Sequence, residues 1–220
     1  MKILAVEFAS PQRSVALADT DANTRCRFAS SEVIETGARS THAFKMIEEA
    51  LGQARVEREQ VDCLAIGLGP GSYTGIRAAI ALAQGWQLAR EIKTTGASSV
   101  AAMAVQAQEE RIYGRVSIIV NAQREEFYLA TWEITEAARN EIEPLKILPL
   151  AEIQSRAAKR EILIGPEAAK ISGGRTIFPY AKAIARLATA PEICVPGEKL
   201  EPIYLRETNF VKAPKPVAAR

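Results

Sequence analysis

Short apolar runs and helical patterns alternate along the chain and predict an α/β fold. Apolar residues that are continuous over a few positions, or that alternate with polar ones, indicate strands, whereas apolar positions three or four apart indicate helices. In the first half the pattern predicts strands over 3–6, 14–18 and 26–34, a helix from an N-capping Ser40 to Arg55, a strand over 63–66, a helix from Thr74 to Arg90, a connector or strand over 92–96 and a helix over 98–107.

The second half shows the same order of elements without a visible sequence repeat. Strands are predicted over 116–120, 126–132, 144–150 and 162–164, and helices over 151–159 and 180–189. We therefore predict two tandem mixed-sheet α/β halves, residues 1–108 and 109–211, followed by a disordered tail over 212–220. This is the plan of the actin-like, hexokinase and Hsp70 ATPase fold (ASKHA), which holds nucleotide phosphates between two hairpin turns, here 7–13 and 121–125.

A glycine-rich loop separates the strand over 63–66 from the helix that follows it. Such a strand, loop and helix can bring backbone N–H groups to an anion. A P-loop is nearly excluded because no Lys follows Gly75. A dinucleotide fingerprint built on Gly69 and Gly71 would have its third glycine one residue late. The other interpretation is a tight, close-packed turn that binds no ligand.

The apolar faces of the two helices over 40–55 and 74–90 differ in width. The first helix has one stripe, made of Phe44, Ile47, Leu51 and Ala54. The second is apolar on two sides, through Ile76, Ala79, Ile80 and Ala83 and through Leu82 and Trp86. An apolar surface wider than one stripe predicts either contact with another chain or burial within one fold.

Composition and charge exclude several functions. The formal net charge of +2 argues against nucleic-acid binding by counterion release. The single histidine, His42, excludes zinc sites that need a histidine pair. The three cysteines form no C-x-x-C pair, which favours reduced thiols in a cytoplasmic protein. The N-terminus does not resemble a signal peptide, and no apolar run is long enough to span a bilayer.

The loop sequence itself carries the most specific signal. Gly69-Pro70-Gly71-Ser72-Tyr73-Thr74-Gly75-Ile76-Arg77 resembles the G-P-G-S-F-T-G-L-R signature of the TsaB (YeaZ) family, with two conservative differences. We call residues 69–75 the signature loop. Further resemblances to the family occur over 3–10, 121–128, 164–167 and 202–206.

The resemblance implies a non-catalytic scaffold in threonylcarbamoyl modification of the adenosine beside the tRNA anticodon. TsaB proteins pair with the catalytic, metal-carrying homologue TsaD through helices of the first half, and the ATPase TsaE joins them. On this resemblance we expect no cofactor, tRNA contact only through the complex, and a homodimer through the same helices when the partner is absent. The candidate partner contacts are Met46, Glu49, Arg77, Ile80 and Ala81.

The chain departs from the family at the expected nucleotide site. Glu7, Phe8 and Ala9 replace the family's D-T-S, and Asn121 replaces an aspartate. Because Mg²⁺ prefers carboxylate and phosphate oxygens, a site built on Glu7, Phe8 and Asn121 is expected to be degenerate. The alternative is a small ATPase or kinase acting alone, with Glu7 facing a metal ion and Ser72 or Thr74 near phosphate.

Overall fold

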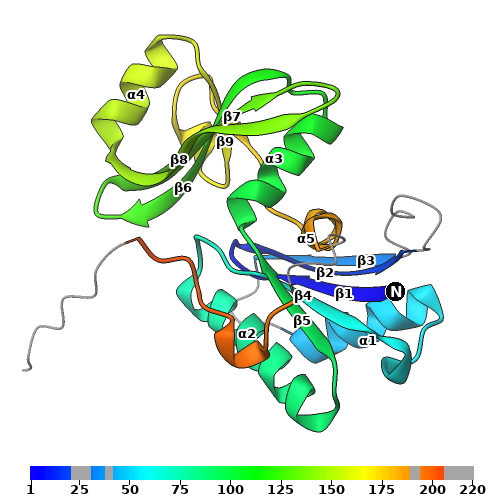
Figure 1. Ribbon diagram of the computed structural model, residues 1–220. Coiled ribbons are helices and arrows are strands. Elements are labelled where there is room, and N and C mark those ends of the chain that lie inside the picture. The colour runs from blue at the N-terminus through cyan, green and yellow to red at the C-terminus, as the bar shows by residue number, and fades with distance from the viewer. Residues whose placement is uncertain (21–30, 38–41, 189–193, 206–220) are drawn as a thin grey trace, which may run out of the picture.

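The computed structural model describes residues 1–20, 31–37, 42–188 and 194–205. These residues form two five-stranded mixed sheets with helices between them and on their outer faces (Figure 1). In the described part of the chain, no helix is long and apolar enough to cross a membrane.

The first sheet has the strand order β3-β2-β1-β4-β5. Its central strands β1 and β4 are parallel, and their apolar runs are buried on both faces, as expected for the middle of a covered sheet. β2 pairs antiparallel with β1 and with β3, which makes a hairpin at the start of the chain. The five strands are β1 (Lys2–Glu7), β2 (Gln12–Asp19), β3 (Ser31–Thr36), β4 (Cys63–Gly67) and β5 (Lys93–Ala97).

Helices cover both faces of this sheet. α1 (Ala43–Ala54) and α2 (Tyr73–Ala89) pack on the outer face, whose core includes Leu4, Leu64 and Ile66. α5 (Ala181–Leu187) packs on the inner face beside α3 (Ser99–Glu109). The division of the chain into halves at residue 108 stays a prediction. Although α5 follows residue 108 in the sequence, it covers the first sheet.

The second sheet has the order β10-β9-β6-β7-β8 and lies on the other side of α3. Its opposite face is covered by α4 (Leu150–Ala158), which inserts Ile153 into a smaller core. The strands are β6 (Gly114–Gln123), β7 (Glu126–Ile134), β8 (Arg139–Pro149), β9 (Ile162–Gly165) and β10 (Arg175–Thr176), and the short 3₁₀ helices of the chain are η1 (Arg58–Gln60), η2 (Ala168–Lys170) and η3 (Gly197–Lys199).

Most predicted elements are confirmed, and a few differ. The stretch over 92–96, predicted as a connector or a strand, is strand β5; β10 was not predicted; and β8 begins five residues before its predicted start because it pairs along the whole of β7. α1 begins at Ala43, so Phe44 lies in its first turn and is 77% exposed instead of joining the buried stripe. The predicted cap Ser40, the first part of the strand over 26–34, and the tail over 212–220 lie outside the described residues.

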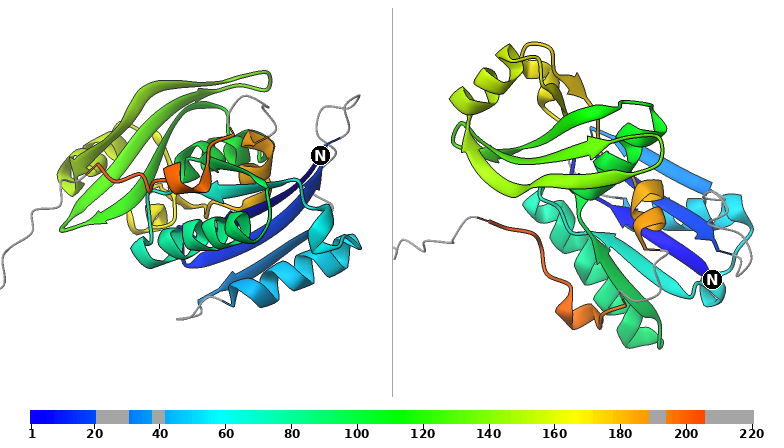
Figure 2. Two further views of the ribbon diagram at one scale, coloured as in Figure 1. Left: turned by 60° about the horizontal axis from the view of Figure 1, so that its bottom comes forward. Right: turned by 45° about the horizontal axis from the view of Figure 1, so that its top comes forward.

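The segment 194–205, here called the C-terminal strap, follows α5 in the chain and contacts the first half. Its Val195 N–H donates to the Thr94 carbonyl at 2.8 Å, and its Ile203 N–H donates to the Leu68 carbonyl at 2.9 Å. Between them Leu200 is buried in the outer core. Figure 2 shows the strap beside α2, which is therefore held by the sheet on one side and by the strap on another.

Candidate functional site

The signature loop packs directly against the first hairpin. The Ser72 N–H donates to the Ala9 carbonyl at 2.7 Å, and Ser72 Oγ caps α2 by accepting from the Gly75 N–H at 3.2 Å. A Cβ atom added at Gly71 or at Gly75 would lie 2.0 Å from a hairpin carbonyl oxygen, that of Ala9 or of Phe8 respectively. The glycines therefore serve close packing, and the Ala9 carbonyl occupies the side of Gly71 on which a Cβ would lie.

Glu7 lies beneath this loop and is fully buried. Its Oε1 accepts from the Ala9 N–H and its Oε2 accepts from Ser99 Oγ–H, both at 2.7 Å. Ser99 Oγ in turn accepts from the Gly69 N–H at 3.2 Å. Burial raises the pKa of Glu7 to about 7, against the opposing effect of its two hydrogen bonds. One carboxyl group thus joins the hairpin, the signature loop and the start of α3.

Glu7 and Phe8 do not face the cleft between the two hairpin turns. Both side chains are fully buried, so the prediction that they line a nucleotide site with Asn121 is wrong for these two residues. The space beneath the loop that receives the Glu7 carboxylate exists because β4 ends in Gly67, where a Cβ would lie 2.2 Å from Glu7 Oε2. Glu7 therefore cannot serve as the metal-facing carboxylate of an ATPase in this arrangement.

The cleft itself has a volume of about 570 Å³ and is lined by both halves. Asn121 lines it, where its N–H donates to Glu167 Oε2 at 3.2 Å and its Oδ1 accepts from the Gln123 N–H at 2.7 Å. Glu167, which ends the 164–167 stretch that resembles the family but was not among the predicted site residues, is the carboxylate that lines the cleft. Within the described ranges, no three His, Cys, Asp or Glu side chains are grouped so that they could hold a metal ion.

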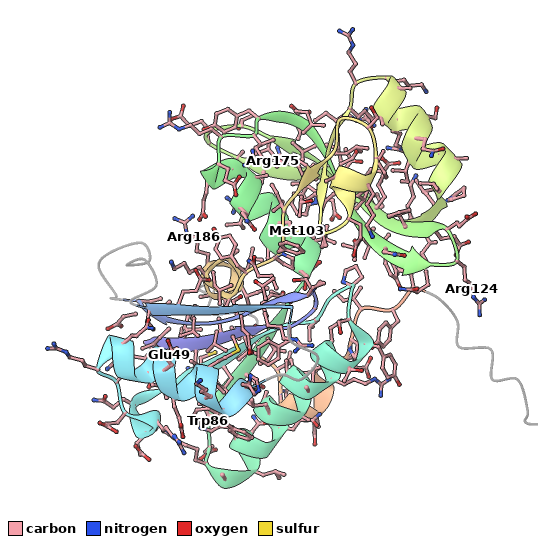
Figure 3. All side chains as sticks on the ribbon, turned by 180° about the vertical axis from the view of Figure 1, so that it is seen from behind. Glu49, Trp86, Met103, Arg124, Arg175 and Arg186 are labelled. Carbon is pink, nitrogen blue, oxygen red and sulfur yellow. The ribbon has the colours of Figure 1, made fainter. Side chains whose placement is uncertain are left out.

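A second hollow, which we call the α1/α2 groove, has a volume of about 790 Å³. Phe44 and Ile47 line it from α1, and Trp86 lines it from α2, beside α1 in Figure 3. At its end Arg90 donates to the carbonyls of Arg58 and Glu59, each at 2.8 Å. The full lining is Phe44, Ile47, Arg58, Glu59, Ala81, Leu82, Gly85, Trp86, Ala89 and Arg90.

The predicted partner contacts are only partly on this surface. Met46 and Ile80 are 3% and 6% exposed and belong to the outer core, so the prediction that they lie on the exposed side is wrong. Ala81 lines the groove, and Glu49 is exposed on α1. Arg77 is exposed and lies over the Tyr73 ring, 4.2 Å from its centroid. Small residues recur at helical spacing along α2, at Ala78, Ala81, Gly85 and Ala89, and of these only Ala81 was among the predicted contacts.

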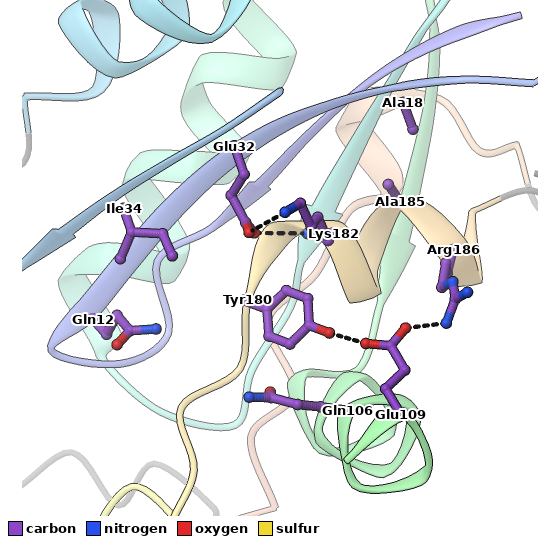
Figure 4. Close-up of a pocket in the computed structure, with 10 residues that line it drawn as sticks. All are labelled: Gln12, Ala18, Glu32, Ile34, Gln106, Glu109, Tyr180, Lys182, Ala185 and Arg186. Carbon is purple, nitrogen blue, oxygen red and sulfur yellow. Dashed lines mark hydrogen bonds and ion pairs between the residues drawn. The ribbon is translucent and has the colours of Figure 1, made fainter. Parts of the chain in front are cut away.

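A third hollow of about 680 Å³ lies where α5 meets α3 and the hairpin (Figure 4). Its charged side chains are paired with one another. Lys182 Nζ is 3.1 Å from Glu32 Oε2, and Glu109 accepts from both Tyr180 and Arg186. The first contact connects α5 to β3, and the Glu109 contacts connect α5 to α3, which packs against both sheets, so this third hollow lies at a structural junction of the two halves.

Comparisons with known proteins agree with this architecture. A family model described as TsaD, tRNA N6-adenosine threonylcarbamoyltransferase, matches residues 37–203. The TsaB protein of Escherichia coli, named as a tRNA threonylcarbamoyladenosine biosynthesis protein, is 28% identical over 94% of this chain and 95% of its own length. A protein of the same name from Haemophilus influenzae is 34% identical over 42% of this chain and 41% of its own. The structure of YeaZ from Pseudomonas aeruginosa superposes with a TM-score of 0.75 at 24% identity, covering 93% of this chain and 99% of that one.

The two mixed sheets and the family match define the class of protein: an ASKHA-fold, TsaD-like chain. Within that class, the chain belongs to the TsaB (YeaZ) family. The family that the signature loop indicated is thereby confirmed, and the similarity to the E. coli protein extends over nearly the whole chain.

The two glycines of α2 give a matched test of the loop packing. We expect Gly75→Ala to lower the free energy of unfolding by about 1–3 kcal/mol, because its methyl group would collide with the Phe8 carbonyl. Gly85→Ala, whose Cβ would meet no atom within 4 Å, should instead raise it by about 0.5–1 kcal/mol. Urea denaturation of both variants measures the difference; equal effects would contradict the proposed close contact.

The buried Glu7 predicts a pH-dependent stability. Its folded pKa is raised to about 7 from 4.5, so the folded state keeps a proton that the unfolded state loses between these values. The free energy of unfolding should therefore fall by on the order of 3 kcal/mol as the pH rises from 4.5 to 7, because the stabilisation that protonated Glu7 contributes is lost. We expect Glu7→Gln to remove this loss and to be the more stable protein at pH 8.

Denaturant titrations from pH 4.5 to 8 check the difference between wild type and Glu7→Gln. Glu143→Gln is a control of opposite sign, because the Arg156 guanidinium, followed by Lys146 and Thr131, lowers the pKa of Glu143. That variant should lose stability at neutral pH. A Glu7→Gln protein whose pH profile parallels that of wild type would show that Glu7 is ionised when buried.

Proposed function

We propose that this chain is a non-catalytic subunit in tRNA threonylcarbamoyladenosine biosynthesis and that its α1/α2 groove binds a TsaD-like catalytic homologue. The observation that carries the proposal is the groove itself, an apolar surface on the two helices that cover the outer face of the first sheet. A TsaE-like ATPase would join this pair, and tRNA would be reached through the complex.

The composition of the groove favours a protein helix as its occupant. Phe44 is 77% exposed in the isolated chain, and burial of a side chain of this kind contributes about 1.5–3 kcal/mol. Ala81, Gly85 and Ala89 are exposed, and small residues at this spacing allow a second helix to come close. A stable complex of standard size would bury on the order of 1,600 Å² in total, which requires surface beyond the groove, including Glu49 and Arg77.

The choice of partner rests on the family. Curated relatives bear the name of the tRNA threonylcarbamoyladenosine pathway, and the family model that matches this chain is that of TsaD. A partner of the same fold would present its own two helices at the corresponding place, so four helices could pack together. Self-association through the same groove is the expected alternative when the homologue is absent.

The cleft supports a non-catalytic role. Its first hairpin presents Ala9 and Ser10, while the carboxylate of Glu7 points into the protein. The Asn121 N–H donates to Glu167, and its side-chain oxygen accepts from the Gln123 N–H, so both groups are already bonded within the protein. Phosphoryl transfer in proteins depends on carboxylate-held Mg²⁺ between the phosphates and the protein, and only Glu167 offers a carboxylate here.

The groove proposal predicts the effect of a charge placed on α2. Ala81→Arg should weaken binding of the TsaD-like homologue from the same organism about tenfold or more, because a guanidinium would be buried in an apolar interface. Ala158→Arg, an exposed alanine on α4, is the matched control and should bind like wild type. Analytical ultracentrifugation or calorimetry of the purified pair measures both. Unchanged affinity of Ala81→Arg with weakened affinity of Ala158→Arg would place the interface on the second half.

The competing interpretation, an ATPase acting alone, is tested on the isolated chain. We expect calorimetry to give a Kd for Mg·ATP weaker than about 1 mM. Asn121→Asp should not restore binding, because Glu7 stays enclosed by the signature loop. Hydrolysis of ATP by the purified chain, abolished by Glu7→Ala, would contradict the non-catalytic proposal.

A further inference from the structure

The C-terminal strap fills the corner between α2 and β5, the strand at the edge of the first sheet. Its η3 turn contacts α2, and Leu200, which follows that turn, is 4% exposed in the outer core. A Cβ atom added at Gly96 of β5 would lie 3.3 Å from Leu200 Cδ2, so the leucine packs closely over the edge strand. The strap is therefore in contact with both the helix and the sheet that carries it.

Two glutamines of α2 bind one glycine of the strap. Gln87 Oε1 accepts from the Gly197 N–H at 2.6 Å, and Gln84 Nε2 donates to the Gly197 carbonyl at 3.1 Å. A Cβ atom at residue 197 would lie 2.7 Å from Gln87 Oε1, so glycine permits this close approach. Both backbone groups of Gly197 are thus bonded to α2, and the helix cannot slide past the strap without breaking both bonds.

The two glutamines face away from the α1/α2 groove. Residues two positions apart on an α-helix project about 200° apart around its axis. Gln84 therefore points away from Leu82 and Trp86, which line the groove. Gln87 in the same way points away from Ala89, which also lines it. The strap and the groove consequently lie on opposite sides of α2.

α2 has a packed neighbour on the strap side and open space on the groove side. The groove is a hollow of about 790 Å³ lined by both α1 and α2. Against the sheet, α2 buries the small residues Gly75, Ala79 and Ala83 beside Ile76 and Ile80. Small side chains make few van der Waals contacts and a hollow offers none, so the position of α2 across the sheet depends on the strap.

We propose that the C-terminal strap sets the width of the α1/α2 groove by holding α2 from the opposite side, with Gln84 and Gln87 as the positioning residues. The inference deepens the proposed function, because its consequence is the affinity of the groove for the TsaD-like homologue. The positioning itself is a property of the isolated chain and has a separate readout.

A partner that fits one groove width binds only the molecules in which α2 holds the corresponding position. The apparent Kd equals the intrinsic Kd divided by the fraction of molecules in the competent arrangement. Loss of the two glutamine side chains, if it leaves α2 correctly placed in a tenth to a third of the molecules, therefore raises the apparent Kd about three- to tenfold.

Hydrogen exchange of the isolated full chain tests the positioning. In the double variant Gln84→Ala, Gln87→Ala we expect the amides of the strap and of α2 to exchange about three- to tenfold faster than in wild type, because the bonds to Gly197 are gone. Alanine is the best helix former, so a weaker intrinsic helix would not explain faster exchange. Gln87 also donates to the Ile92 carbonyl, so Gln84→Ala alone should give a smaller change in the same direction.

Gln108→Ala is the matched control. This glutamine, on α3, also bonds to backbone carbonyls through its side chain, those of Thr135 and Glu136. Its removal should leave the exchange of the strap and of α2 as in wild type. Faster exchange of the strap in the double variant with unchanged exchange of α2 would overturn the proposal, because α2 would then keep its place without the strap.

Calorimetry with the purified TsaD-like homologue from the same organism tests the consequence, at a temperature where every variant is folded. We expect the double variant to bind about three- to tenfold more weakly than wild type, and Gln108→Ala to bind like wild type. Faster exchange of α2 with unchanged affinity would show that the strap does not set a groove width that the partner requires. If wild type itself does not bind the homologue, the proposed function fails, and the exchange measurement alone decides whether the strap positions α2.

Discussion

The close approach of the signature loop to the first hairpin is the constraint on which the rest of the site depends. Gly71 and Gly75 let the loop come against the carbonyls of Ala9 and Phe8, and Gly67 leaves the space that the Glu7 carboxylate fills. Glu7 then receives hydrogen bonds from the hairpin and from Ser99 of α3. Because a carboxyl group without water must have its hydrogen bonds satisfied by protein groups, the loop, the hairpin and α3 are held in one arrangement.

This arrangement changes what the first hairpin presents to the cleft. The Glu7 carboxyl group is buried beneath the loop and does not face the cleft. The Phe8 ring is also fully buried and packs in the core. The signature sequence is therefore explained by packing: its glycines position α2 against β1 and β4. What α2 then presents outward is its side of the α1/α2 groove, which is lined by Trp86 and by the small residues Ala81, Gly85 and Ala89.

The sequence predicted the order of elements well because strand and helix periodicities are local properties. The buried apolar runs of β1 and β4 and the helical spacing in α2 needed no tertiary information. Met46 and Ile80 were misplaced for the opposite reason: periodicity gives the angle between apolar positions on a helix but not which of two apolar sides the sheet will cover. Glu7 was misplaced because a polar residue at a strand end is usually solvated, and only the neighbouring Gly67 reveals the space into which it turns.

By itself, the sequence determined the α/β class, the duplicated order of elements and the family, since each is encoded in contiguous residues. The tertiary structure decided the inward orientation of Glu7, the exposure of Phe44 and the packing of α5 on the first sheet. These features depend on contacts between segments that are distant in the chain, such as β1 with α3 and β5 with the C-terminal strap. Such contacts arise from the way the sheets and helices pack, which no local pattern records.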